Sequence, residues 1–254
     1  MSNHVEGPVI PGAEPFYYPA GESACLLIHG IAGTPQVFRL MGDSLFQEGI
    51  TVSAVRLRGH ATRLEDLDLC RYQDWITSAE EELIKLDQHY SKVFVAGLSM
   101  GGVISLRLAR LYPEIVKGVV TICSPYRLDS LKFKLVPLAK RFIKRTLPGP
   151  PSINDPDAFE ISYRQHSIPA VHELIKLTDL VREDLPHIRQ PVLIFRALKD
   201  SVVNYNDGQS YFDALSTEDK EIIVLKNSHH VATLDYDKEI IFKKTAAFIK
   251  QHSI

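Results

Sequence analysis

The stretch KVFVAGLSMGG, residues 92–102, joins a predicted strand to a predicted helix, with Ser99 at the corner between them. Residues 93–96 are apolar and partly β-branched, which is typical of a buried strand. Residues 103–112 carry apolar side chains at helical spacing. The pentapeptide GLSMG, residues 97–101, therefore has the strand, turn and helix context in which a flanked serine is informative.

A serine on such a corner needs small neighbours. Side chains at the flanking positions would collide with the adjoining strand and helix, and Gly97 and Gly101 relieve that crowding. The N–H groups of Met100 and Gly101 open the helix, where they can face developing negative charge and the helix dipole adds to their effect. The motif predicts a nucleophile at Ser99 with half of an oxyanion hole beside it, and an ordinary strand-to-helix turn is the alternative.

Strands and helices alternate along most of the chain. Apolar runs predict buried strands over 24–28, 51–55, 116–123, 191–196 and 221–225, and helical spacing predicts helices over 35–48, 72–90, 208–215 and 238–250. Residues 7–19, rich in proline and glycine, are expected to be irregular. The alternation predicts an α/β fold in which a mostly parallel central sheet is covered by helices on both faces.

Residues 125–186 interrupt this alternation. Two helical stretches flank Pro148-Gly149-Pro150-Pro151, and the first carries Leu131, Leu135, Leu138 and Phe142 at helical spacing among several lysines and arginines. We interpret 125–186 as a small helical lid over the carboxyl edge of the sheet, inserted into a core formed by 1–124 and 187–254. Contact of the basic helix with an anionic membrane surface is the alternative.

The composition excludes several classes of protein. The 254 residues, 45% hydrophobic and 24% charged, are ordinary for a soluble domain, and a net charge of −2 gives no electrostatic case for a nucleic-acid partner. Cys25, Cys70 and Cys123 are too few and too scattered for a disulfide framework or a zinc site. Without a leader pattern or an apolar run of membrane length, we expect a cytoplasmic protein that has no stable membrane anchor.

A serine nucleophile requires a base and an orienting acid. A hydroxyl attacks poorly unless a base accepts its proton, and a carboxylate must hold that base in the right tautomer. Both should follow strand carboxyl ends on the edge that bears Ser99. Asp200 comes directly after the strand predicted over 191–196, and His229 and His230 follow the strand predicted over 221–225. From position alone, either of these two neighbouring histidines could be the base.

The sequence resembles the α/β-hydrolase superfamily, most closely small bacterial carboxylesterases and monoacylglycerol lipases, over essentially its whole length. The resemblance rests on HGIAGTP at 29–35, RLRGHAT at 56–62, GLSMGG at 97–102, KDSVV at 199–203 and NSHHVATLD at 227–235. It implies a nucleophile at Ser99, an acid at Asp200 and a base at His230. It also implies oxyanion donors at the backbone N–H groups of Ile31 and Met100.

Some positions differ from the pattern of such relatives. Ile31 stands where an aromatic residue usually lines the acyl pocket, His229 where tyrosine is usual, and Ala61 where glycine is usual. Ile31 keeps its backbone donor but alters the pocket's shape, so the preferred acyl length is left open. His29 and His60 are expected to fix their glycine-containing loops, with His60 as the alternative base.

The expected function is that of a serine carboxylesterase. It would hydrolyse short- to medium-chain acyl esters, monoacylglycerols among them, through an acyl-enzyme on Ser99. The expected partner is a small-molecule ester, and no metal or organic cofactor is required. The alternatives are the same triad in thioester hydrolysis, acyl transfer or C–C bond hydrolysis, and a non-catalytic protein that uses this fold to bind a small ligand.

Overall fold

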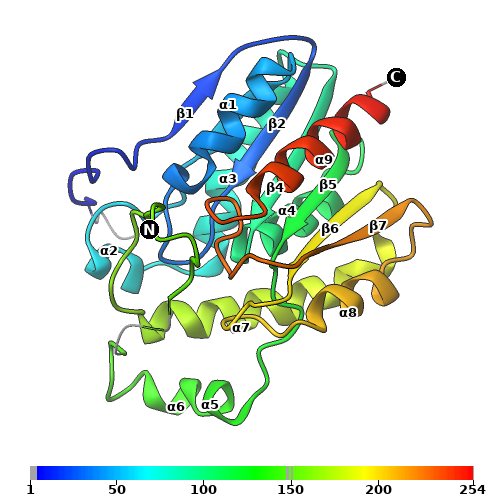
Figure 1. Cartoon of the computed structure of the whole chain (residues 1–254). Coiled ribbons are helices and arrows are strands. Elements are labelled where there is room, and N and C mark those ends of the chain that lie inside the picture. The colour runs from blue at the N-terminus through cyan, green and yellow to red at the C-terminus, as the bar shows by residue number, and fades with distance from the viewer. Residues whose placement is uncertain (1–4, 147–148, 150, 254) are drawn as a thin grey trace.

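A computed structural model describes residues 5–146, 149 and 151–253. Within this part of the chain, seven strands form one sheet in the order β1-β3-β2-β4-β5-β6-β7 (Figure 1). Strand β1 is antiparallel to β3 and the other neighbours are parallel. The strands are β1 Phe16–Tyr18, β2 Ser23–Ile28, β3 Thr51–Val55, β4 Lys92–Leu98, β5 Val116–Ile122, β6 Val192–Ala197 and β7 Lys220–Leu225.

Helices cover both faces of the sheet. Side chains of α1 and α9 pack in the core on one face, and side chains of α3, α4, α7 and α8 pack in the core on the other. The helices are α1 Arg39–Gln47, α2 Leu64–Asp68, α3 Tyr72–Asp87, α4 Met100–Leu111, α5 Leu131–Lys134, α6 Val136–Ala139, α7 Ile168–Asp184, α8 Asp207–Ala214 and α9 Lys238–Gln251, with 3-10 turns at Pro35–Phe38 and Leu185–His187. The predicted mostly parallel sheet with two covered faces is confirmed.

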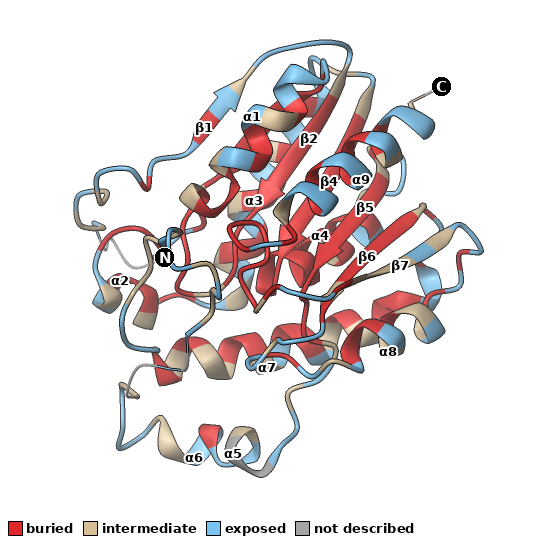
Figure 2. Ribbon diagram, viewed as in Figure 1, coloured by how far each residue is buried: buried red, intermediate tan, exposed pale blue. Residues whose placement is uncertain are grey.

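The central apolar runs, such as those of β2, β4 and β5, form strands because both faces of each of these strands are buried (Figure 2). In β2, Ala24, Leu26 and Ile28 enter one core, while Cys25 and Leu27 enter the other. Successive side chains of a strand point to opposite faces, so a strand buried on both sides needs an unbroken apolar run. Such runs are the reason why the central strands could be predicted from the sequence.

The register brings the carboxyl ends of the parallel strands to one edge. Ile28 of β2 pairs with Gly97 of β4, and Leu98 of β4 pairs with Ile122 of β5. Further along the sheet, Ala197 of β6 pairs with Leu225 of β7. The segments that follow β2, β4, β6 and β7 therefore leave the sheet along this one edge, and they carry the residues singled out in the sequence.

Residues 125–186 divide into parts that pack differently. Helices α5 and α6 lie apart from the sheet in Figure 1, whereas α7 packs against α4 and α3. Ala170, Leu174, Leu177 and Val181 of α7 belong to the core on that face. Arg145 also joins the segment to α2 through an ion pair with Asp68, with an N···O distance of 2.6 Å. The assignment of 125–186 as a lid stays a prediction, and α7 within it contributes to the core.

The helix expected early in this segment is broken into α5 and α6. Pro137 lies at the start of α6, where its missing N–H costs nothing, but it cannot continue a helix that began upstream. Leu135, Leu138 and Phe142 of the predicted apolar stripe are not buried, since they are 54%, 59% and 81% exposed. Of the predicted core and lid, Met1–His4, 147, 148, 150 and 254 lie outside the described residues.

No helix in the described residues is both long enough and apolar enough to cross a membrane.

Candidate active site

Ser99 occupies a strained turn between β4 and α4. Its backbone has φ of 54° and ψ of −120°, and φ lies in the left-handed range that residues with a Cβ avoid. The N–H group of Ser99 donates to the carbonyl of Ile122 at 2.8 Å, which ties the turn to β5. The residue is 6% exposed, so the turn presents its hydroxyl in an enclosed setting. Strain of this kind persists only where the surrounding packing enforces it.

The glycines around Ser99 are required by close backbone approaches. A Cβ on Gly101 would lie 1.8 Å from the carbonyl oxygen of Ile28, and one on Gly97 would lie 2.1 Å from the carbonyl carbon of Gly101. A Cβ on Gly30 would lie 3.2 Å from the Cβ of Ser99, so the loop after β2 runs directly against the serine. The glycine spacing of GLSMG is therefore a packing requirement of the turn, as the sequence indicated.

Asp200 and His230 form a hydrogen-bonded pair. His230 Nδ1 lies 2.8 Å from Asp200 Oδ2, while Asp200 Oδ1 accepts from the N–H groups of Val202 at 2.8 Å and Val203 at 2.9 Å. Burial opposes ionisation of Asp200, but its bonds to His230 and to the two backbone donors prevail, so the carboxyl pKa is lowered. Asp200 is thus held as a carboxylate facing the imidazole.

The loop that bears His230 is held by two buried carboxylates. Asp235 accepts from the N–H of His229 at 2.7 Å and also from the N–H groups of Asn154 and Asp155 at 2.9 and 3.0 Å. Asp237 accepts from the N–H groups of Asn227 and Ser228. His229 is anchored through its backbone, while its neighbour reaches Asp200. Of the two histidines, the structure brings His230 to the acid.

Ile31 and Met100 flank Ser99 on different elements. Met100 is the first residue of α4, and Ile31 follows Gly30 in the loop after β2. This loop turns through Ala32, whose φ is 62°, and through a bond from the N–H of Gly33 to the carbonyl of Gly30 at 3.2 Å. Their assignment as oxyanion donors stays a prediction, and the packing of Gly30 on Ser99 places the two candidate donors near the serine.

His29 and His60 are fully buried behind this edge. His29 Nε2 accepts from the N–H of Leu57 at 3.2 Å, and the two imidazole centroids lie 4.9 Å apart. Burial lowers the pKa of His60 to about 4 and that of His29 well below its usual range. Both rings are therefore neutral near pH 7 and join neighbouring loops, in agreement with the loop-fixing role expected for them.

Sequence reasoning missed Glu160, whose carboxyl group lies against the loop after β2 that runs along Ser99. Its Oε1 would be 3.4 Å from a Cβ built on Gly33, and its Oε2 accepts from the hydroxyl of Ser152 at 3.3 Å. Burial raises its pKa, although attraction to a nearby His230 acts in the opposite direction. Glu160 belongs to an irregular segment, where no periodicity or motif could have indicated its position.

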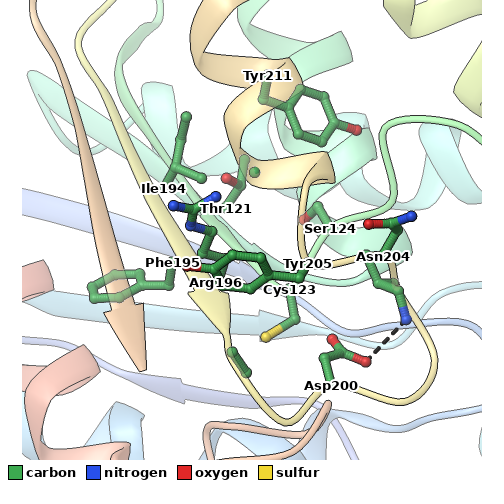
Figure 3. Close-up of a pocket in the computed structure, with 13 residues that line it drawn as sticks. Thr121, Cys123, Ser124, Ile194, Phe195, Arg196, Asp200, Asn204, Tyr205 and Tyr211 are labelled. Carbon is green, nitrogen blue, oxygen red and sulfur yellow. Dashed lines mark hydrogen bonds between the residues drawn. The ribbon is translucent and has the colours of Figure 1, made fainter. Parts of the chain in front are cut away.

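A cavity of about 10 Å³ lies behind Asp200, and Figure 3 shows Cys123 next to Asp200 in its wall. Ser124, Asn204 and Tyr205 also line it. Cys123 is fully buried at the end of β5, with φ of 49°, and burial together with nearby Asp200 raises its thiol pKa well above the usual range. The thiol is therefore protonated and unreactive near neutral pH.

A parallel sheet, a strained serine between β4 and α4, and an acid and histidine after β6 and β7 define an α/β-hydrolase. The chain belongs to the α/β-hydrolase family whose model is described as serine aminopeptidase, S33, and this model matches residues 20–237. The superfamily and the hydrolase fold predicted from the motifs are confirmed.

Relatives of known activity match nearly the whole chain. A thermostable monoacylglycerol lipase from Bacillus sp. (strain H-257) is 35% identical and covers 97% of this chain and 98% of its own length. A carboxylesterase from Bacillus subtilis (strain 168) is 27% identical over 94% of this chain and 96% of its own. A solved structure from work on LipS and LipT, two metagenome-derived lipolytic enzymes, is 31% identical with a TM-score of 0.92, covering 96% of this chain and 100% of that one.

Proposed function

We propose that this carboxylic ester hydrolase cleaves short- to medium-chain acyl esters, monoacylglycerols among them, through an acyl-enzyme on Ser99. The observation that carries the proposal is the 2.8 Å contact between His230 Nδ1 and Asp200 Oδ2 at the sheet edge that bears the strained serine. A histidine held by a carboxylate is the base that a serine nucleophile needs.

The reaction follows from this pairing. When Nδ1 of His230 donates to Asp200, Nε2 is left as an acceptor, and it takes the hydroxyl proton as Ser99 Oγ attacks the ester carbonyl. The N–H groups of Ile31 and Met100 stabilise the negative charge on the carbonyl oxygen. The protonated imidazole then gives its proton to the leaving alcohol, and water attacks the acyl-enzyme by the same route.

The proposed substrate class rests on the relatives and on Glu160. The Bacillus sp. relative is a monoacylglycerol lipase, and the Bacillus subtilis relative is a carboxylesterase. Glu160 places a half-buried carboxyl group close enough to His230 to interact with it electrostatically, and we assign the departing alcohol of the substrate to this side of the histidine. A carboxyl oxygen has several acceptor sites, and the free hydroxyls of a glycerol ester are suitable donors to it.

Hydrolysis of a p-nitrophenyl ester series from acetate to palmitate, together with a monoacylglycerol, tests the reaction. Wild type should be most active on short or medium chains, and Ser99→Ala and His230→Ala should each lose several powers of ten in turnover. His229→Ala is the matched control and should retain most activity, since His230 makes the contact with Asp200. Equal losses in the two histidine variants would remove the assignment of the base.

The variant Glu160→Gln tests whether Glu160 recognises the alcohol part of the substrate. The variant should lose about tenfold in kcat/KM on a monoacylglycerol, in line with one hydrogen bond to a charged group. The ethyl ester of the same acid has no free hydroxyl and should be hydrolysed as before. Parallel assays with a thioester of that acid compare hydrolysis of oxygen and sulfur esters, and a large preference for the thioester would argue against the proposed substrate class.

A further inference from the structure

We propose that residues 159–163, within the expected lid, hold the loop after β2 in the geometry that the oxyanion hole requires, with Tyr163 and Thr34 as positioning residues. This inference rests on the proposed function, because it concerns the N–H of Ile31 as an oxyanion donor. It assigns a structural role in the active site to part of the predicted lid, which would otherwise be expected only to cover the substrate.

The segment runs along the loop and is bonded to it at several points. The N–H of Tyr163 donates to the carbonyl of Ala32 at 3.1 Å, and the hydroxyl of Thr34 donates to the carbonyl of Ile161 at 2.9 Å. The side chain of Gln36 accepts from the N–H of Ile161 and donates to the carbonyl of Phe159, both at 3.1 Å. These bonds hold the loop on both sides of Gly33, at Ala32 and at Thr34.

The hydroxyl of Tyr163 extends the connection to the loop after β3. It accepts from the N–H of Thr62 at 3.0 Å and faces the carbonyl oxygens of Gly59 at 3.0 Å and Arg63 at 3.1 Å. The hydroxyl of Tyr163 therefore contacts three backbone positions in and next to the loop after β3. The backbone N–H of the same residue binds the loop after β2. Residues 159–163 thus join the two loops at the catalytic edge.

The loop after β2 needs such support because it is strained next to the candidate donor. Ala32 has φ of 62°, a conformation that a residue with a Cβ adopts only when its surroundings enforce it. The carbonyl of this same residue accepts the bond from Tyr163. Since the orientation of the Ile31 N–H depends on the turn at Ala32, loss of these contacts should weaken binding of the oxyanion while leaving the rest of the site in place.

A trifluoromethyl ketone of the preferred chain length reads out the oxyanion hole directly. Ser99 Oγ adds to its carbonyl carbon, the hydroxyl proton passes to His230, and the carbonyl oxygen becomes a hemiketal oxyanion. Tyr163→Phe keeps the N–H bond to Ala32 but releases residues 159–163 from the loop after β3. In this variant the inhibition constant should rise and kcat should fall, each about tenfold, while KM changes less than about twofold. Tyr90→Phe removes a phenol hydroxyl bonded to Tyr17, outside the catalytic edge, and should change neither value.

A second pair of variants keeps the test decisive if Tyr163→Phe folds poorly. Thr34→Val removes the hydroxyl that bonds Ile161 and should reproduce the loss in kcat and in ketone affinity, whereas Thr34→Ser keeps the hydroxyl and should restore both. Lower melting temperatures with unchanged kcat and inhibition constants would overturn the positioning role. Wild type that hydrolyses no ester would instead overturn the proposed function, so the two failures are distinguishable.

Discussion

Replacement of Gly101 by alanine should damage both the fold and the reaction. The new Cβ would lie 1.8 Å from the carbonyl oxygen of Ile28, 2.6 Å from its carbonyl carbon and 2.8 Å from the carbonyl oxygen of His29. Ordinary contacts between such atoms are about 3.5 Å, so the groups must separate by roughly 1.7 Å. All three atoms belong to the backbone, and no rotation of a side chain can relieve the clash. Either the start of α4 or the end of β2 must move.

The magnitude follows from the size of that displacement. Overpacking of this kind costs about 1–3 kcal/mol, and since it involves backbone we expect the upper part of that range. For a chain of this size, the melting temperature should fall by roughly 5–10 °C. Movement of about 1 Å at Ser99 should lower kcat/KM about a hundredfold, because proximity and orientation of the nucleophile depend on it.

Calorimetry and p-nitrophenyl ester kinetics measure the two effects in the same preparation. Gly7→Ala is the control, because its Cβ would meet only the flexible side chain of Arg63, at 2.8 Å. It should change the melting temperature little. A Gly101→Ala protein that melts and turns over like wild type would refute the steric reasoning.

Two further variants test the roles of the Asp200 and Asp207 carboxyl groups. Asp200→Asn should keep the fold by circular dichroism but lower kcat by about 10⁴, since the amide no longer fixes the tautomer of His230; a loss below tenfold would remove Asp200 as the orienting acid. Burial raises the pKa of Asp207 to about 6, so the folded state binds this proton more tightly than the unfolded chain. Its contribution to stability is present at acid pH and is lost as pH rises to about 6 and above. Asp207→Asn should therefore gain in melting temperature relative to wild type more at pH 7 than at pH 4, and an equal difference at both pH values would argue against the raised pKa.

The elements that the sequence predicted are those with a strong local pattern. The runs in β2 and β4 are continuous because both faces of these strands are buried, and the helical spacing in α3 reflects its one buried face, whereas α4 is buried over most of its circumference. Strand β1 lies within residues 7–19, for which irregular structure was predicted, because three residues give no period and the strand forms through pairing with β3. Pairing partners of this kind are set by the tertiary structure.

The candidate site likewise contains residues that a local sequence pattern predicted and residues that no such pattern indicated. Ser99 and Asp200 lie directly beyond regular strands, where motif and position agree, and the structure brings Asp200 together with His230. Glu160 and Tyr163 reach the same edge from an irregular segment of the predicted lid. Their roles depend on contacts across more than a hundred residues of chain, as in the bond from Tyr163 to Gly59. No local pattern encodes such contacts.

Labelling with a fluorophosphonate, followed by peptide mass mapping, addresses the nucleophile itself. We expect a single phosphonyl group on Ser99 of the wild-type protein, with ester hydrolysis falling in proportion to the labelled fraction. Ser99→Ala should take up no label and hydrolyse esters no faster than the residual level left by binding and oxyanion effects. Stoichiometric labelling at another residue, or near-wild-type ester hydrolysis by Ser99→Ala, would contradict the acyl-enzyme mechanism.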